Sequence, residues 1–310
     1  MNTIEQAAKR LEQLRRAGVD LGESITPSTT PDNAPPRSTS PEDLTATAPV
    51  AVTVTEPEKK ASSTPASDKR SREVELDFRK MHDSGLLIPG RERSSLEEEF
   101  RIIKRPLLEN VKGHGASKPE RANLIMVTSS LPGEGKTQTA INLAISMAME
   151  LDHTVLLVEA DVVKPSALAR LGVPSEKGLM DLLSDSTLDV ADVLLKTNIP
   201  KLTLLPAGTS QARSTELLGS ATMDALLDEL ATKYSDRIVV FDSPPLLPST
   251  EARVMSAHMG QVVMVVEAGK TPLNAIKQSF ATLEEHPVVL SMLNKYQGPK
   301  GKEAYGYYAP

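Results

Sequence analysis

The 310-residue chain contains no cysteine. This absence excludes disulfides, thiol nucleophiles and cysteine-ligated zinc. Long apolar stretches are missing too, because no run approaches the ~20 residues that cross a bilayer, and the first residues lack the apolar core of a signal peptide. The formal net charge of −6 argues against a general nucleic-acid binder. We therefore expect a cytoplasmic protein that binds no nucleic acid, or one that is attached to a membrane only through a partner.

The stretch LIMVTSSLPGEGKTQT, residues 124–139, has the pattern of a phosphate-binding loop. An apolar run ends at Val127, a turn containing proline and glycine follows, and Lys136-Thr137 opens an amphipathic segment. In such a strand–loop–helix unit, backbone N–H groups and the helix N-terminus cradle a polyphosphate. Lys136 would reach the β- and γ-phosphates of ATP, and the Thr137 hydroxyl would ligate Mg²⁺.

The loop departs from the full pattern at its first position, where Ser130 replaces glycine. We expect the Ser130 backbone to take the turn that glycine normally takes, and a positive φ there would be costly for serine. A chance glycine-rich turn before a helix is the alternative interpretation. The residues expected to bind the cofactor ATP are Gly133, Glu134, Gly135, Lys136, Thr137, Gln138 and Asn294, of which Asn294 would meet the base.

From Asn123 onward, apolar runs alternate with helical segments. Strands that are apolar on both faces and separated by helices favour a mostly parallel sheet with helices on both faces, an α/β fold of the P-loop NTPase type. The expected strands are 124–128, 154–158, 202–205, 238–241, 262–266 and 288–293. The expected helices are 136–150, a broken stretch over 165–197, 214–233, 249–258 and 272–285.

Acidic residues follow two of these strands. One strand ends in Glu159-Ala160-Asp161, and another ends in Asp242-Ser243. Because ligands of open α/β sheets bind at the carboxyl ends of the strands, and a phosphate loop holding Mg²⁺ needs a carboxylate near the metal, these acids are candidates for the site. We expect Thr137, Asp161 and Asp242 to hold the metal, and Glu159 to accept a proton or position a water. Ordinary strand-end capping is the alternative for any one acid.

Composition divides the chain into four parts. A short helix is expected over 1–18, with a fraying terminus or a docking segment as alternative roles. Residues 19–93 are predicted as a disordered linker rich in Pro, Ser and Thr, because most of them cannot bury enough surface to offset conformational entropy; 71–93 lead into the fold. The P-loop domain is expected over 94–295, followed by a flexible tail over 296–310.

Residues 94–111 are predicted to form a helix capped by Ser94 or Ser95. Its apolar residues share one face, and Glu98, Arg101 and Arg105 form a separate charged stripe. That stripe is either a solvated face with internal ion pairs or a self-association surface. We expect Pro106 to kink this helix or to end its first part.

Three of the five tyrosines lie in the last six residues of the chain, at Tyr305, Tyr307 and Tyr308. Tyrosines clustered on a mobile tail near a nucleotide site are candidate phosphoacceptors. A sticky aromatic tail without chemistry is the alternative.

Over residues 95–310 the chain resembles the bacterial tyrosine autokinases of exopolysaccharide systems, and its start looks most like their exosortase-associated subgroup. The resemblance rests on SSLPGEGKT, the strand-end EAD and DSPP, and the terminal tyrosines. The segment EEFRIIKR looks like that family's ExxRxxR oligomerisation motif, with Glu98, Arg101 and Lys104. Two positions depart from the family pattern: Glu159 replaces aspartate and Val163 replaces arginine. Lys104 in place of arginine also loses bidentate pairing.

The resemblance implies an ATP- and Mg²⁺-dependent kinase that phosphorylates its own tail in trans, within a ring-type homo-oligomer. It implies control of polysaccharide synthesis or export, and a separate membrane co-polymerase as activator. Lys136, Glu159, Asp161 and Asp242 would be the catalytic residues. A partition or positioning ATPase is the competing hypothesis, although Leu131 stands where that subclass has a second lysine. A non-catalytic nucleotide-gated scaffold is the third.

Overall fold

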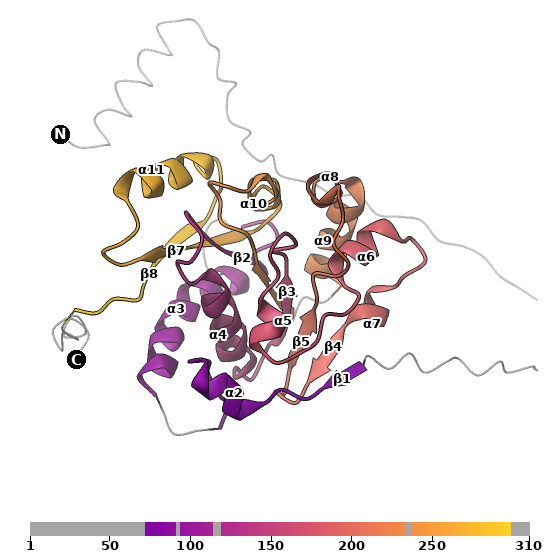
Figure 1. Ribbon diagram of the computed structural model, residues 1–310, viewed down its shortest axis with the longest axis horizontal. Coiled ribbons are helices and arrows are strands. Elements are labelled where there is room, and N and C mark those ends of the chain that lie inside the picture. The colour runs from indigo at the N-terminus through magenta and orange to yellow at the C-terminus, as the bar shows by residue number, and fades with distance from the viewer. Residues whose placement is uncertain (1–71, 91–93, 114–118, 234–236, 299–310) are drawn as a thin grey trace, which may run out of the picture. The chain divides into compact units, whose positions relative to one another are not determined.

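The computed structural model describes residues 72–90, 94–113, 119–233 and 237–298. Within these ranges one eight-stranded sheet has the order β1-β4-β5-β3-β6-β2-β7-β8, with β2 near its middle (Figure 1). Strands β4 and β5 are antiparallel, and every other neighbouring pair is parallel. The strands are β1 (Arg72–Val74), β2 (Leu124–Ser129), β3 (Thr154–Glu159), β4 (Leu195–Thr197), β5 (Leu202–Leu205), β6 (Arg237–Asp242), β7 (Gln261–Glu267) and β8 (Val289–Asn294).

Helices cover both faces of the sheet (Figure 1). One face carries α2 (Phe78–Asp83), α3 (Ser95–Lys112), α4 (Lys136–Ala148) and α5 (Ala167–Arg170). The other carries α6 (Leu179–Ser184), α7 (Val190–Val193), α8 (Ser214–Leu218), α9 (Ala221–Thr232), α10 (Thr250–Ser256) and α11 (Leu273–Thr282). This confirms the predicted α/β fold of the P-loop type. Among the described residues, no helix is long and apolar enough to cross a membrane.

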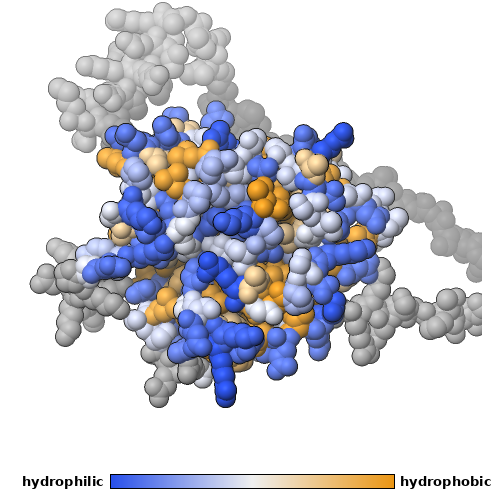
Figure 2. Space-filling view, viewed as in Figure 1, coloured by the Kyte–Doolittle hydropathy of each residue, from blue (hydrophilic) through white to orange (hydrophobic). Residues whose placement is uncertain are grey.

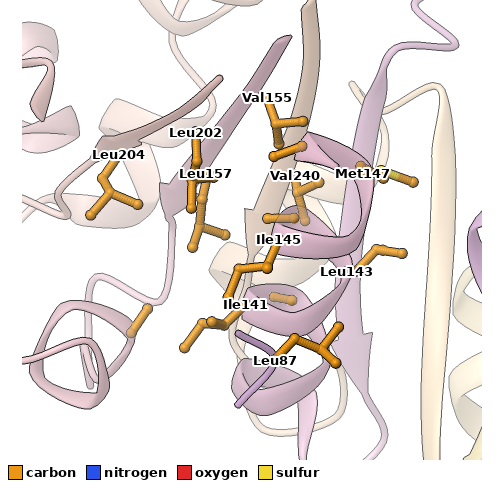
Figure 3. Packing of buried hydrophobic residues seen from close by; sticks show 14 of the residues in the cluster. Leu87, Ile141, Leu143, Ile145, Met147, Val155, Leu157, Leu202, Leu204 and Val240 are labelled. Carbon is orange, nitrogen blue, oxygen red and sulfur yellow. The ribbon is translucent and has the colours of Figure 1, made fainter. Parts of the chain in front are cut away.

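The central strands are apolar on both faces because each face packs against a helical layer. In β2, Ile125 and Val127 belong to the core beneath α4, whereas Leu124 and Met126 belong to the core on the opposite face. Figure 3 shows the first of these cores, with side chains of α4 packed against those of β3, β5 and β6. On the outside, Figure 2 shows hydrophilic residues over most of one face, with smaller hydrophobic areas between them.

Two short strands at one end of the sheet, β1 and β4, were not predicted. Strand β1 corrects the expected linker over 19–93, and β4 lies at the end of the stretch over 165–197 that was expected to be helical. Strand β1 pairs in parallel with β4, and Leu76, Met81 and Leu86 that follow β1 are buried. The folded part therefore begins by Arg72. A three-residue strand with a single apolar residue, REV, has too little pattern to be recognised; its pairing depends on a partner far along the chain. Residues 1–71, including the predicted helix over 1–18, lie outside the described residues.

Helix α3 continues through Pro106, so the expectation that this proline could end the helix is wrong. Proline lacks the N–H that would bond to the carbonyl group four residues earlier, in Ile102. The Ile102 residue is 48% exposed, so water can reach that part of the helix. Tertiary packing outweighs the lost bond, because Phe100 and Leu107 are buried on the opposite side of the helix.

Candidate functional site

The phosphate loop connects β2 to α4 at the carboxyl end of the central strand. Its positive φ angles occur at Gly133 (89°) and Gly135 (103°), where glycine adopts them without strain. Ser130 is not among the described non-glycine residues with positive φ, so the expected costly backbone at Ser130 is wrong. Its hydroxyl oxygen is buried without a hydrogen-bond partner. The turn is therefore made by the two glycines nearest α4.

Lys136 and Thr137 are the first residues of α4, and they lie beside Asp161, which follows β3. The Lys136 Nζ atom lies 2.7 Å from Asp161 Oδ2, and both side chains are largely buried. The Thr137 hydroxyl lies 3.5 Å from Lys136 Nζ and 3.4 Å from the hydroxyl oxygen of Ser166. The predicted lysine, threonine and aspartate are thus brought together although they come from two segments of the chain.

Asp242 ends β6, which lies between β2 and β3. Its carboxyl group is fully buried, and no described residue makes a hydrogen bond of standard geometry to either oxygen, although the nearby Thr137 hydroxyl acts to lower the Asp242 pKa. Burial raises the pKa of Asp242 to about 7, although the positive charge of Lys136 opposes the shift. A buried carboxylate with empty acceptor positions fits a cation, and Mg²⁺ prefers oxygen ligands. The residues here therefore suit a magnesium ion beside Thr137.

Glu159 is paired in register with Asp242 on the neighbouring strand. Its Oε1 atom accepts hydrogen bonds from the N–H groups of Ala167 (2.6 Å) and Leu168 (3.3 Å), at the start of α5. Burial raises the pKa of the Glu159 carboxyl above its usual range, against the effect of these donors. The Glu159 carboxylate therefore accepts the N–H groups at the start of α5, and it also lies on the strand next to Asp242.

Two residues predicted to bind nucleotide have contacts within the protein. Gln138 Nε2 donates to the carbonyl oxygens of Ser84 (2.9 Å) and Gly85 (2.7 Å), and so ties the N-terminal segment to α4. Asn294 Nδ2 donates to the carbonyl oxygen of Glu134 at 2.9 Å. The amide of Asn294 therefore contacts the loop backbone.

The predicted oligomerisation residues separate into an exposed pair and a buried lysine. Arg101 forms intrahelical ion pairs with Glu97 (3.1 Å) and Glu98 (3.0 Å). Lys104 shares the buried face of α3; its Nζ atom donates to Ser146 O and pairs with Glu150 Oε1, each at 2.6 Å. Because Lys104 is buried and already compensates a carbonyl in the last turn of α4, it is not exposed together with Glu98 and Arg101, although the resemblance to the oligomerisation motif grouped the three.

Sequence reasoning missed several residues that contact the loop from outside. Thr271 reaches it from the turn between β7 and α11, and Lys295 reaches it from the end of β8. Glu267, the last residue of β7, pairs with Lys295 behind the loop. Only the neighbouring Asn294 gave a signal, since it closes the last predicted strand. The tail tyrosines Tyr305, Tyr307 and Tyr308 lie outside the described residues.

A glycine-rich loop between a central parallel strand and a helix, with a lysine and the carboxylates of two nearby strands converging on it, defines a P-loop nucleotide-binding protein. The family model described as "AAA domain" matches residues 122–289. The tyrosine-protein kinase YwqD of Bacillus subtilis is 32% identical over 220 residues, which cover 70% of this chain and 87% of YwqD. The chain therefore belongs to the bacterial tyrosine-protein kinases.

The chain is also similar to a second tyrosine-protein kinase and to a solved structure. The tyrosine-protein kinase wzc of Salmonella typhimurium is 27% identical over 74% of this chain, but the match covers only 31% of wzc. The crystal structure of the chimerical protein CapA2B2 is similar with a TM-score of 0.56 and 26% identity, covering 72% of this chain and 93% of that one.

Proposed function

We propose that this chain is an ATP-dependent protein-tyrosine autokinase that phosphorylates Tyr305, Tyr307 and Tyr308 of its own tail. The observation that carries the proposal is the convergence of Lys136, Asp161 and Asp242 at the carboxyl ends of adjacent strands. Membership in the tyrosine-protein kinases supports it, and so does the tyrosine-rich C-terminus.

Each polar group of the site has a role in this proposal. In the absence of nucleotide, Asp161 holds the Lys136 ammonium at 2.7 Å, and the lysine would turn from this carboxylate toward the γ-phosphate. Thr137, Asp161 and Asp242 would hold Mg²⁺. When bound, Mg²⁺ neutralises charge on the β- and γ-phosphates. The loop N–H groups and Lys136 stabilise the charge that develops on the transferred group.

The acceptor is a tail tyrosine of a neighbouring copy. Its phenol oxygen forms a bond to the γ-phosphorus while the bond from that phosphorus to the β,γ-bridging oxygen breaks, and ADP leaves. Glu159 takes the phenol proton, because its raised pKa lies closer to neutral pH than that of a solvated glutamate. Asp161 is less suited to this role, since in this proposal its carboxylate would hold Mg²⁺.

The Glu159 assignment has its own test. Glu159→Gln keeps a carbonyl oxygen for the N–H groups of Ala167 and Leu168 but removes the proton acceptor. Loss of a general base lowers turnover by roughly 10²–10⁴-fold. We expect that loss in single-turnover phosphorylation, with nucleotide affinity unchanged. Turnover equal to that of the unmodified protein would exclude Glu159 as the base.

We further propose that the kinase acts in a ring-type homo-oligomer and regulates exopolysaccharide synthesis or export. The exposed Glu98–Arg101 pair of α3 is the candidate contact between copies. Phosphorylated tails carry about −2 charge per tyrosine, so they would repel one another and loosen the ring. The cytosolic segment of a separate membrane co-polymerase is the proposed activator, supported by the chimerical construction named CapA2B2 in a similar structure.

Size measurement in solution tests the assembly. Glu98→Ala combined with Arg101→Ala should shift the dephosphorylated protein toward a smaller mass without lowering its melting temperature by more than a few degrees, because exposed ion pairs contribute about 0–1 kcal/mol. An unchanged mass would remove this helix from the interface.

A further inference from the structure

The outer side of the phosphate loop is held by two consecutive residues at the end of β8. Lys295 Nζ donates to the carbonyl oxygen of Gly133 at 2.6 Å, and Asn294 Nδ2 donates to that of Glu134 at 2.9 Å. These two carbonyls belong to the part of the loop that would surround the phosphates.

A second layer of contacts supports these two donors. Glu267 Oε2 pairs with Lys295 Nζ at 3.1 Å, and the Glu267 N–H donates to the Thr271 hydroxyl at 3.0 Å. The Thr271 hydroxyl in turn donates to Glu134 Oε1. Glu134 is only 3% exposed, and its other carboxyl oxygen, Oε2, accepts a hydrogen bond from the N–H of Leu131 at 2.8 Å. The loop is therefore joined through side chains to the β7–α11 turn and to β8.

The planar trans peptide gives these contacts a consequence for the opposite side of the loop. In each peptide unit the C=O of one residue and the N–H of the next point in opposite directions. When the Gly133 and Glu134 carbonyls face Asn294 and Lys295, the N–H groups of Glu134 and Gly135 face away from them. That is the direction of the cradle formed by the loop and the N-terminus of α4.

The close approach of Asn294 also explains the glycine at position 135. A Cβ atom there would lie 2.1 Å from Asn294 Nδ2, and the φ of +103° would be strained for any other residue. Position 133 has no such neighbour, since a Cβ atom there would meet nothing within 4 Å. Gly135 is thus needed both for its backbone angle and for this contact.

We propose that Glu267, Thr271, Asn294 and Lys295, here called the loop-supporting cluster, are positioning residues for phosphate binding. The cluster holds two loop carbonyls so that the N–H groups of Glu134 and Gly135 are oriented toward a polyphosphate before it binds. This rests on the proposed function only in taking a nucleoside di- or triphosphate as the ligand. It assigns Asn294 to the loop backbone instead of the nucleotide base.

Nucleotide affinity of the full-length protein, measured with fluorescent ADP and by competition with ATP and GTP, tests the proposal. Lys295→Met removes the charged donor but keeps the chain length, and Thr271→Val removes the hydroxyl but keeps the shape. Lys270→Met is the matched control, because Lys270 pairs with Glu267 at 3.3 Å and, within the described part of the chain, its side chain makes no hydrogen bond or ion pair to the loop. Thr271→Ser retains the hydroxyl and should restore binding.

We expect Lys295→Met and Thr271→Val to weaken ADP and ATP binding by about 10- to 150-fold, which corresponds to losing a hydrogen bond to a charged group. The ratio of ATP to GTP affinity should stay unchanged, because phosphates are affected and the base is not. Hydrogen exchange in the peptide covering the loop should be faster in both variants without nucleotide, which is a readout independent of kinase activity.

Two results would overturn the proposal. One is an affinity and a loop exchange rate for Lys295→Met equal to those of Lys270→Met. The other is a changed ATP-to-GTP ratio in an Asn294→Ala variant, which would return Asn294 to the base. If the unmodified protein binds nucleotide but shows no tyrosine phosphorylation, that result would count against the proposed function alone.

Discussion

Asp242 should destabilise the nucleotide-free protein at neutral and alkaline pH. Its carboxyl group is fully buried without a hydrogen bond of standard geometry from the described part of the chain, and burial raises its pKa from 3.8 to about 7. The folded state therefore binds the proton more tightly than the unfolded state does, and stability falls as pH rises between ~4 and ~7. A difference of about 3 pH units corresponds to a cost of about 4 kcal/mol above pH 7.

Asp242→Asn keeps the side-chain shape and removes the charge. At pH 8 we expect the free energy of unfolding of the nucleotide-free variant to exceed that of the unmodified protein by up to about 4 kcal/mol. At pH 4 the two proteins should be nearly equal, since aspartate is then protonated in the folded state. Urea unfolding at both pH values measures this difference. Asp152→Asn, at an exposed position, is the control.

The same variant should respond less to Mg²⁺ and nucleotide. A ligand that binds only the folded state raises the melting temperature, and the rise grows with the ratio of ligand concentration to dissociation constant. The unmodified protein should gain stability from ADP with Mg²⁺, and Asp242→Asn should lose most of that gain. The reasoning is refuted if the variant is no more stable than the unmodified protein at pH 8, or if its advantage is the same at pH 4 and pH 8.

Other substitutions test other parts of the structure. Gly135→Ala should abolish nucleotide binding measured by fluorescence, because alanine is strained at a φ of +103° and its Cβ would displace the Asn294 amide from the loop. Lys104→Met should lower the free energy of unfolding by about 1–3 kcal/mol in urea, less than for a fully buried pair because Glu150 is 41% exposed, and should leave the oligomer mass unchanged. Lys136→Met should leave the fold intact by circular dichroism and eliminate phosphate transfer; residual transfer would contradict its role.

Much of the fold could be predicted because the central strands are buried on both sides. All six predicted strands, from β2 to β8 without β4, are present within one or two residues of their expected ends. Strands β1 and β4 could not be predicted, because each has only three residues and depends on pairing with a distant segment. The apolar residues over 86–88 form a short run, but nothing in the sequence indicates which element packs against them.

The site was predictable where chemistry depends on local spacing. The GEGKT loop and the strand-end acids follow from short patterns, and the sheet order brings Asp161 and Asp242 near Lys136. The burial of Lys104 was predictable in principle, because helical spacing places it on the same face as Phe100 and Leu107, which are buried. It was instead grouped with Glu98 and Arg101 because of the resemblance to the oligomerisation motif. Contacts of Thr271 and Lys295 with the loop could not be predicted, because nothing in their own segments indicates a partner over 130 residues away.

The most direct test of the proposed activity is a phosphopeptide map of the last ten residues. The full-length protein is incubated with ATP and Mg²⁺, alone and with the cytosolic segment of the proposed co-polymerase, and is then analysed by mass spectrometry. We predict phosphate on Tyr305, Tyr307 or Tyr308 and none in Lys136→Met. Nucleotide hydrolysis with no phosphate on any of the three tyrosines, even with the activating segment present, would contradict the account.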